Sequence, residues 1–141
     1  MQRFEETRHI TGMSPDEVFD YITDPANGPE LVSAAKQVRA EGEPGEGRVL
    51  VTKAGFLGMD FESRSTVTAW DPGRRYAFSG DEPFHLGFDF ALSDEDGGTR
   101  VDASLETDPG SFFPLGSRMV GKRIGKQFSK DLDKVEKDLS T

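Results

Sequence analysis

Apolar and polar residues alternate along much of this chain, and a two-residue period of this kind is typical of a β-strand with one buried face. The alternating runs are bounded by Gly, Pro, Asn, Asp or Ser, which favour turns. Asp71-Pro72-Gly73 and Asp96-Gly97-Gly98 are two such turns, short enough to join antiparallel neighbours. The pattern therefore predicts an antiparallel meander with strands over residues 3–11, 36–41, 47–54, 58–70, 74–80, 84–93 and 99–107.

One face of the predicted sheet is apolar and the other is charged. Asp60, Glu62 and Arg64 fall on the charged face, which we expect to meet water. The apolar face on three of the strands comprises Met59, Phe61, Ser63, Ser65 and Val67, then Phe84, Leu86, Phe88, Phe90 and Leu92, then Val101, Ala103 and Leu105. This face needs a covering layer, because exposed apolar surface of that extent is rare in a monomeric protein.

Residues after the first strand predict a short helix. Ser14 is followed by Pro15 at the first helical position and by Glu17 three residues after the cap, which is the pattern of a capping box. The helix is expected to end near Asp24, because a residue that precedes proline avoids the helical conformation. A second short helical turn is expected over residues 29–35.

The hydrophobic period changes to three or four residues near the C-terminus, which predicts a long helix over residues 114–139. Gly121 and Gly125 border its apolar stripe, and glycine within a helix costs about 1 kcal/mol relative to alanine. We therefore expect another element or a ligand to approach the helix closely there. The stripe consists of Phe113, Ser117, Val120, Ile124, Phe128, Leu132, Val135 and Leu139.

Length and composition favour a single domain over residues 1–141, with eleven Phe residues to fill its core. No run approaches the ~20 apolar residues that span a bilayer, and the first residues lack the order of a signal peptide, so we expect a cytoplasmic protein. Cysteine is absent, which excludes disulfides and thiolate chemistry.

The net charge of −9 argues against nucleic-acid binding, since phosphates would be repelled. The basic residues are nevertheless unevenly placed, because residues 117–130 contain five Lys or Arg residues and no acid. This helix face is either simply solvated or able to attract anionic lipid. Membrane contact is therefore a weakly supported possibility, and the sequence leaves the choice between monomer and homodimer open.

The order of elements and several local motifs resemble the START-like superfamily, and within it the polyketide cyclase/dehydrase and lipid-transport type. The resemblance covers nearly the whole chain, and its motifs are the segment from Met13 to Pro25, Val67-Thr68-Ala69-Trp70-Asp71-Pro72, Gly98-Thr99-Arg100-Val101 and Asp108-Pro109-Gly110. It implies an α+β helix-grip fold, in which a curved seven-stranded antiparallel sheet wraps around the long C-terminal helix and two short helices follow the first strand. It also implies a cavity for lipids, polyketides or aromatic compounds, without a required cofactor.

A pocket between the sheet and the last helix is the predicted ligand-binding site. Ser63 and Ser65 lie on the apolar face and could bind a ligand hydroxyl or carbonyl, or else be satisfied by the backbone. The first hypothesis is therefore a binding protein for a small hydrophobic or amphipathic molecule. The expected contacts are Phe61, Ser63, Ser65, Phe88, Phe90, Val120, Ile124 and Phe128.

A cyclase/dehydrase-like enzyme is the second hypothesis, and Glu6, Arg8 and Tyr76 are its weak catalytic candidates. Glu6 and Arg8 share a strand face with apolar residues, but a position at the sheet edge would let them reach water, and we favour that alternative. Tyr76 could offer its phenol to a substrate or fill the core, and the core is favoured. A third hypothesis is a helper domain that binds protein through a sheet edge.

The sequence lacks the residues that a metal site, a phosphate-binding loop or a serine hydrolase would need. Two distant His residues and outward-facing carboxylates give no metal site, and no phosphate loop or serine-hydrolase elbow is present. Phe56 and Leu57 lie at a predicted hairpin tip, and Leu115 and Met119 fall beside the basic helix residues. These four either line a pocket mouth or contact a membrane or partner, or a neighbouring loop covers them, which we favour.

Overall fold

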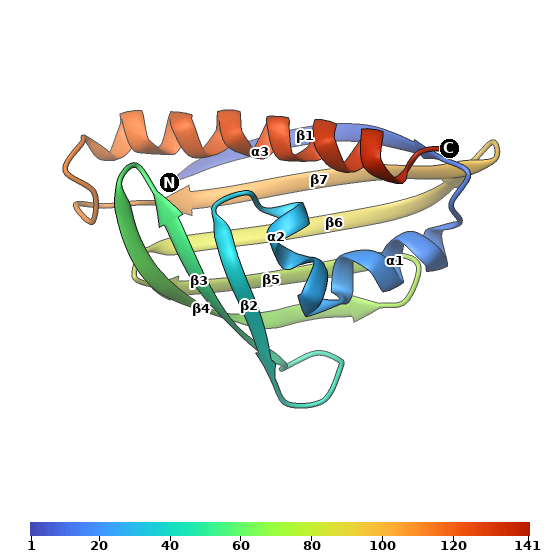
Figure 1. Cartoon of the computed structure of the whole chain (residues 1–141), viewed down its shortest axis with the longest axis horizontal. Coiled ribbons are helices and arrows are strands. Elements are labelled where there is room, and N and C mark those ends of the chain that lie inside the picture. The colour runs from blue at the N-terminus through green and yellow to red at the C-terminus, as the bar shows by residue number, and fades with distance from the viewer.

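The computed structural model describes all residues, 1–141, and contains one seven-stranded antiparallel sheet in the order β1-β7-β6-β5-β4-β3-β2. The strands are β1 (Gln2–Thr11), β2 (Ala35–Glu41), β3 (Val49–Phe56), β4 (Met59–Asp71), β5 (Arg75–Glu82), β6 (His85–Glu95) and β7 (Gly98–Asp108). The helical segments are α1 (Pro15–Thr23), the 3-10 turn η1 (Pro25–Asn27), α2 (Gly28–Leu31) and α3 (Ser117–Leu139). Figure 1 shows α3 along one side of the sheet and α1 and α2 across its open part. The helix-grip prediction is therefore confirmed.

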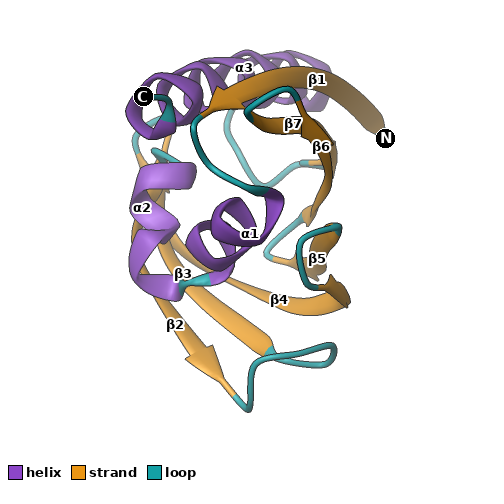
Figure 2. Ribbon diagram, turned by 90° about the vertical axis from the view of Figure 1, so that its right-hand side faces the viewer, coloured by secondary structure: helices purple, strands orange, loops and turns teal.

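The sheet is strongly curved, and the bend is concentrated in β4 and β5. Their pairing shifts register between Arg64 and Thr66 and again between Val67 and Ala69. Gly80 is needed at this bend, because a side chain there would overlap the backbone carbonyl of Arg64. Viewed from the end, the strands turn around an interior that α1 and α2 close from one side (Figure 2).

Local signals set the first helix as predicted, while the second differs. The Ser14 hydroxyl accepts from the Glu17 N–H and the Glu17 carboxylate accepts from the Ser14 N–H, so the capping box is formed. Residues 29–35 were expected to be helical, but helical structure resumes at Pro25 and ends at Leu31. The Asp24 carboxylate accepts from the Ala26 N–H and starts the new turn, and Val32 is already extended.

The long helix α3 begins at Ser117 rather than at residue 114, with Gly116 at its N-cap. Its C-terminal end is bonded to the edge strand β1: the His9 N–H donates to the Glu136 carboxylate, and the Thr141 N–H donates to the Thr11 carbonyl. A side chain at Gly125 would overlap the Phe4 ring of β1. The close approach predicted at this glycine is thus the approach of β1, not of a ligand.

Two clusters of buried apolar side chains fill the interior. The larger cluster joins α1, the sheet and the C-terminal half of α3, and the smaller one contains Phe84, Phe113 and Val120. The smaller cluster seals the end where β7 runs into α3. No helix is long and apolar enough to cross a membrane.

Candidate functional site

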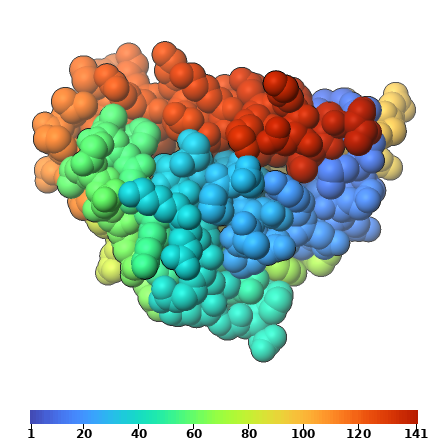
Figure 3. Space-filling model, viewed as in Figure 1, coloured from blue at the N-terminus to red at the C-terminus, as the bar shows by residue number.

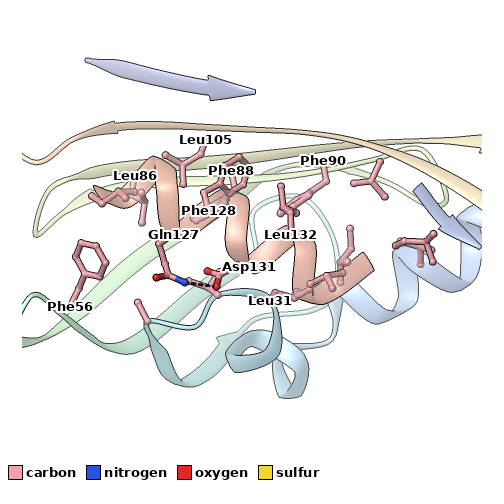
Figure 4. Close-up of a pocket in the computed structure, with 18 of the residues that line it drawn as sticks. Leu31, Phe56, Leu86, Phe88, Phe90, Leu105, Gln127, Phe128, Asp131 and Leu132 are labelled. Carbon is pink, nitrogen blue, oxygen red and sulfur yellow. Dashed lines mark hydrogen bonds between the residues drawn. The ribbon is translucent and has the colours of Figure 1, made fainter. Parts of the chain in front are cut away.

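An apolar cavity lies between the concave side of the sheet, α3 and the α1–α2 segment. It consists of two adjoining spaces of about 80 and 120 Å³. The two spaces share part of their walls. The residues that border both are Ile22, Leu31, Val32, Ala34, Phe61, Leu86, Phe88 and Phe90. All but two side chains around the first space are apolar, and Figure 4 shows those of α3, such as Phe128 and Leu132, beside those of the sheet, such as Phe88 and Phe90. The interior is therefore not solid at the place where the sequence predicted a pocket.

Aromatic rings from adjacent strands form the floor of the cavity. Phe88 stacks on Phe78 with ring centroids 5.1 Å apart, and it lies parallel to Phe90 at 6.3 Å. Phe128 of α3 approaches Phe88 at 6.0 Å from the helix side. These contacts between β5, β6 and α3 fix the shape of the floor. Phe61 lies at the end nearest the smaller cluster, 5.7 Å from Phe84.

The structure brings together seven of the eight residues expected to bind ligand: Phe61, Ser63, Ser65, Phe88, Phe90, Ile124 and Phe128. Val120 is the exception. It is fully buried between Phe84 and Phe113 in the smaller cluster and does not border the cavity. The apolar stripe of α3 therefore divides: its first turn packs in the smaller cluster, and the following turns face the cavity.

The second space carries most of the polar groups of the cavity. Ser63 and Ser65 border it from β4, Thr52 from β3 and Tyr76 from β5. Tyr76 is only 3% exposed and packs edge-on against Trp70, and its burial raises the pKa of the phenol to about 12. The phenol is therefore a hydrogen-bond donor at neutral pH rather than a base.

Gln127 and Asp131 are polar residues of the cavity wall that sequence reasoning missed. Asp131 is only 7% exposed, although carboxylates are rarely buried. Its Oδ1 accepts from Gln127 Nε2 at 2.9 Å and its Oδ2 accepts from the Ser33 N–H at 3.2 Å. Figure 4 shows the pair side by side on the face of α3 toward α2. Their i, i+4 spacing beside Phe128 was the available signal, but the burial of Asp131 depends on the segment after α2, where Ser33 contacts it.

Glu6 and Arg8, the other catalytic candidates, do not border the cavity. They lie between the edge strand β1 and α3, where Arg8 pairs with Glu6 and with Asp133, each at 2.9 Å. The Arg8 guanidinium also donates to the carbonyl and hydroxyl of Ser129. Burial opposes the charge of this guanidinium, but the Glu6 and Asp133 carboxylates outweigh it and raise the pKa of Arg8. This placement ties α3 to β1.

A neighbouring loop covers the β3–β4 hairpin tip, as we favoured from the sequence. Phe56 packs against Phe113 with ring centroids 5.9 Å apart, and Leu57 is part of the same cluster. For Leu115 and Met119 the same prediction is wrong, because both remain exposed at the start of α3. In the space-filling view the helix, the hairpin tip and the α1–α2 segment meet along one seam (Figure 3).

Solved structures from several organisms share this fold. TTHA0849 from Thermus thermophilus superposes with a TM-score of 0.74 at 17% identity, over 98% of this chain and 94% of that one. A START superfamily protein from Mycobacterium smegmatis gives 0.70 at 13% identity, over 98% and 99%. One half of the di-domain ARO/CYC StfQ from the steffimycin biosynthetic pathway gives 0.71 at 14% identity, over 97% and 50%.

The sequence itself matches one family model over nearly its whole length. A comparison with curated proteins gave no match. Residues 1–140 match the model described as polyketide cyclase / dehydrase and lipid transport. The helix-grip architecture and the apolar cavity agree with that match, and the chain belongs to the polyketide cyclase/dehydrase and lipid transport family.

Proposed function

We propose that this protein binds a small hydrophobic or amphipathic molecule in the cavity between its sheet and α3. The observation that carries the proposal is the wall of the first space, in which only Gln127 and Asp131 are polar. Burial of apolar ligand surface contributes about 25 cal/mol per Å², so such a wall favours lipid-like, polyketide-like or aromatic compounds. The family description supports the same classes of ligand.

The size of the cavity limits the ligand. Spaces of about 80 and 120 Å³ are smaller than the ~300 Å³ at the lower end of ligand pockets. A ligand that occupies both spaces is therefore compact, or its entry separates the hairpin tip at Phe56 from the loop that precedes α3. Phe56 borders the first space and contacts Phe113 of that loop, so the Phe56–Phe113 contact would open in the second case.

Native mass spectrometry of the purified protein tests the proposal directly, because a retained ligand adds its own mass. Thermal unfolding with lipid and aromatic extracts gives a second measurement, since a ligand specific for the folded state raises Tm. Ala34→Phe should fill the space shared by both parts of the cavity and abolish the shift, and Phe88→Arg should place a charge in it. Met119→Arg is the matched control, because Met119 is 54% exposed on α3.

An enzyme of cyclase/dehydrase type is the second candidate, and the buried Tyr76 phenol favours it. A phenol that stays protonated at neutral pH can donate a hydrogen bond to a substrate carbonyl. The StfQ ARO/CYC half has the same fold, which is consistent with this chemistry but does not require it. The enzyme would be favoured if the protein converts a poly-β-ketone substrate and if Tyr76→Phe abolishes the conversion without loss of binding.

Protein binding is the remaining hypothesis. If neither ligands nor cavity variants have an effect, binding of a protein at the β2 edge of the sheet becomes the better hypothesis.

Contact with an anionic membrane surface is compatible with the proposed binding of a lipid-like ligand. The five basic residues of α3 between residues 117 and 130 take part in no ion pair. Leu115 and Met119 are exposed next to them. Cosedimentation with phosphatidylglycerol vesicles, but not with phosphatidylcholine vesicles, would support this contact, and Lys122→Glu with Arg123→Glu should weaken it.

A further inference from the structure

Asp131 is a buried carboxylate on the cavity wall without a cationic partner. Its hydrogen bonds come from an amide side chain and a backbone N–H, both neutral donors. Lys134, one turn along α3, pairs with Glu30 and Asp138 instead. A buried charge that lacks a counter-ion is costly, so its presence in an otherwise apolar wall needs a reason.

The pair formed by Asp131 and Gln127 offers acceptors to the cavity. A carboxylate can accept about four hydrogen bonds, and Asp131 receives two within the protein. Gln127 uses its amide nitrogen on Asp131, and its carbonyl oxygen has no partner among the side chains or backbone. Unused acceptors on an otherwise apolar wall complement a ligand group that donates hydrogen bonds.

We propose that the Asp131–Gln127 pair recognises a hydrogen-bond-donating head group, a hydroxyl or an ammonium, on an otherwise apolar ligand. This inference rests on the proposed binding function and specifies its ligand. The apolar body of the ligand lies against Phe88, Phe90 and Phe128, while the head group turns toward α2. A ligand with the same body but no donor leaves the carboxylate unpaired and binds more weakly.

Matched naphthalene probes separate the contributions of body and head group. 2-Naphthol carries a hydroxyl donor, 2-naphthylmethylamine carries an ammonium, and 2-methoxynaphthalene keeps the body without a donor. Titration calorimetry of the full chain should show the two donors binding about tenfold or more tighter than the methyl ether, the usual effect of a hydrogen bond to a buried charge. Binding of both donors at the affinity of the ether would overturn the inference while leaving the binding function intact.

Variants then test whether Asp131 is the cause of the preference. Asp131→Leu should still bind 2-methoxynaphthalene and should lose the higher affinity for 2-naphthol and 2-naphthylmethylamine. Asp131→Asn keeps an acceptor oxygen without the charge, so it should lose the ammonium preference and retain part of the hydroxyl preference. Asp138→Asn is the matched control, because that carboxylate pairs with Lys134 on the outer side of α3 and should change neither.

A purely structural role for Asp131 predicts a different result. The Ser33 N–H bond helps to hold the segment between α2 and β2, so Asp131→Leu can lower Tm. A lower Tm with an unchanged donor preference, in either Asp131 variant, would overturn the inference. Failure of the wild-type protein to bind any probe or any extract would overturn the proposed function, and the inference with it.

Discussion

The position of α3 against β1 depends on Gly125, and a pair of alanine substitutions measures that dependence. A Cβ at Gly125 would overlap three atoms of the Phe4 ring, which is packed against the main core. A Cβ at Gly121 would meet only the end of the Gln2 side chain, which can rotate away. Gly121→Ala and Gly125→Ala therefore differ mainly in the atoms that the new Cβ would overlap: a mobile side-chain end at Gly121 and a packed ring at Gly125.

The magnitude follows from two opposing contributions. Alanine gains about 1 kcal/mol over glycine inside a helix at both positions. Overpacking against a fixed ring costs roughly 1–3 kcal/mol and applies only at Gly125. Since the helix contribution cancels in the comparison, Gly125→Ala should unfold more easily than Gly121→Ala by about 1–3 kcal/mol. For a chain of 141 residues this corresponds to a difference in Tm of roughly 3–10 °C.

Urea unfolding followed by circular dichroism gives the free energy of unfolding, and calorimetry gives Tm. Phe4→Leu in the Gly125→Ala background should recover part of the loss, because a smaller side chain removes the overlap. Equal stability of the two alanine variants would refute the reasoning. It would mean that the Phe4 ring moves aside at little cost and that Gly125 does not set the distance between α3 and β1.

Three further predictions concern charged and titrating groups. The hydrogen bond with Asp81 raises the pKa of His85, so this group stabilises the fold below its unfolded pKa of about 6.5, and the contribution is lost as pH rises through the folded value. His85→Gln should flatten the dependence of Tm on pH across that window. Burial raises the pKa of Tyr76 to about 12, so ultraviolet titration should show one tyrosine ionising near that pH, and Tyr76→Phe should remove it. Arg8→Met should lower the free energy of unfolding by about 1–3 kcal/mol, because it breaks half-buried ion pairs between β1 and α3, whereas the exposed Arg3→Met should change it little.

The pattern of the sequence was sufficient for the elements and their order. Alternation predicted the ends of the strands to within about two residues, and the capping box at Ser14 predicted the start of α1. The second helical turn was misplaced, because the segment has no apolar period and its start depends on the Asp24 cap. Local chemistry is therefore predictable where a period or a cap is strong.

The candidate site was only partly predictable, because burial of a helix side chain depends on what is packed over it. The apolar stripe of α3 indicated that Ile124 and Phe128 face the sheet, and both border the cavity, but it could not show that Val120 packs in the smaller cluster instead. Asp131 appears in the sequence as one more acid on a charged helix. Only the segment after α2, which donates to it through Ser33, makes it a cavity residue.

The sequence by itself determined which faces of the sheet and of α3 are apolar, since the periods of 2 and 3.6 residues are local properties of the backbone. The tertiary structure decided where the space between those faces stays open and which polar groups border it. It also decided that Glu6 and Arg8 pair beneath α3 rather than face the cavity. These outcomes depend on contacts between residues far apart in the sequence, such as Arg8 with Asp133 and Ser33 with Asp131, and no local pattern records them.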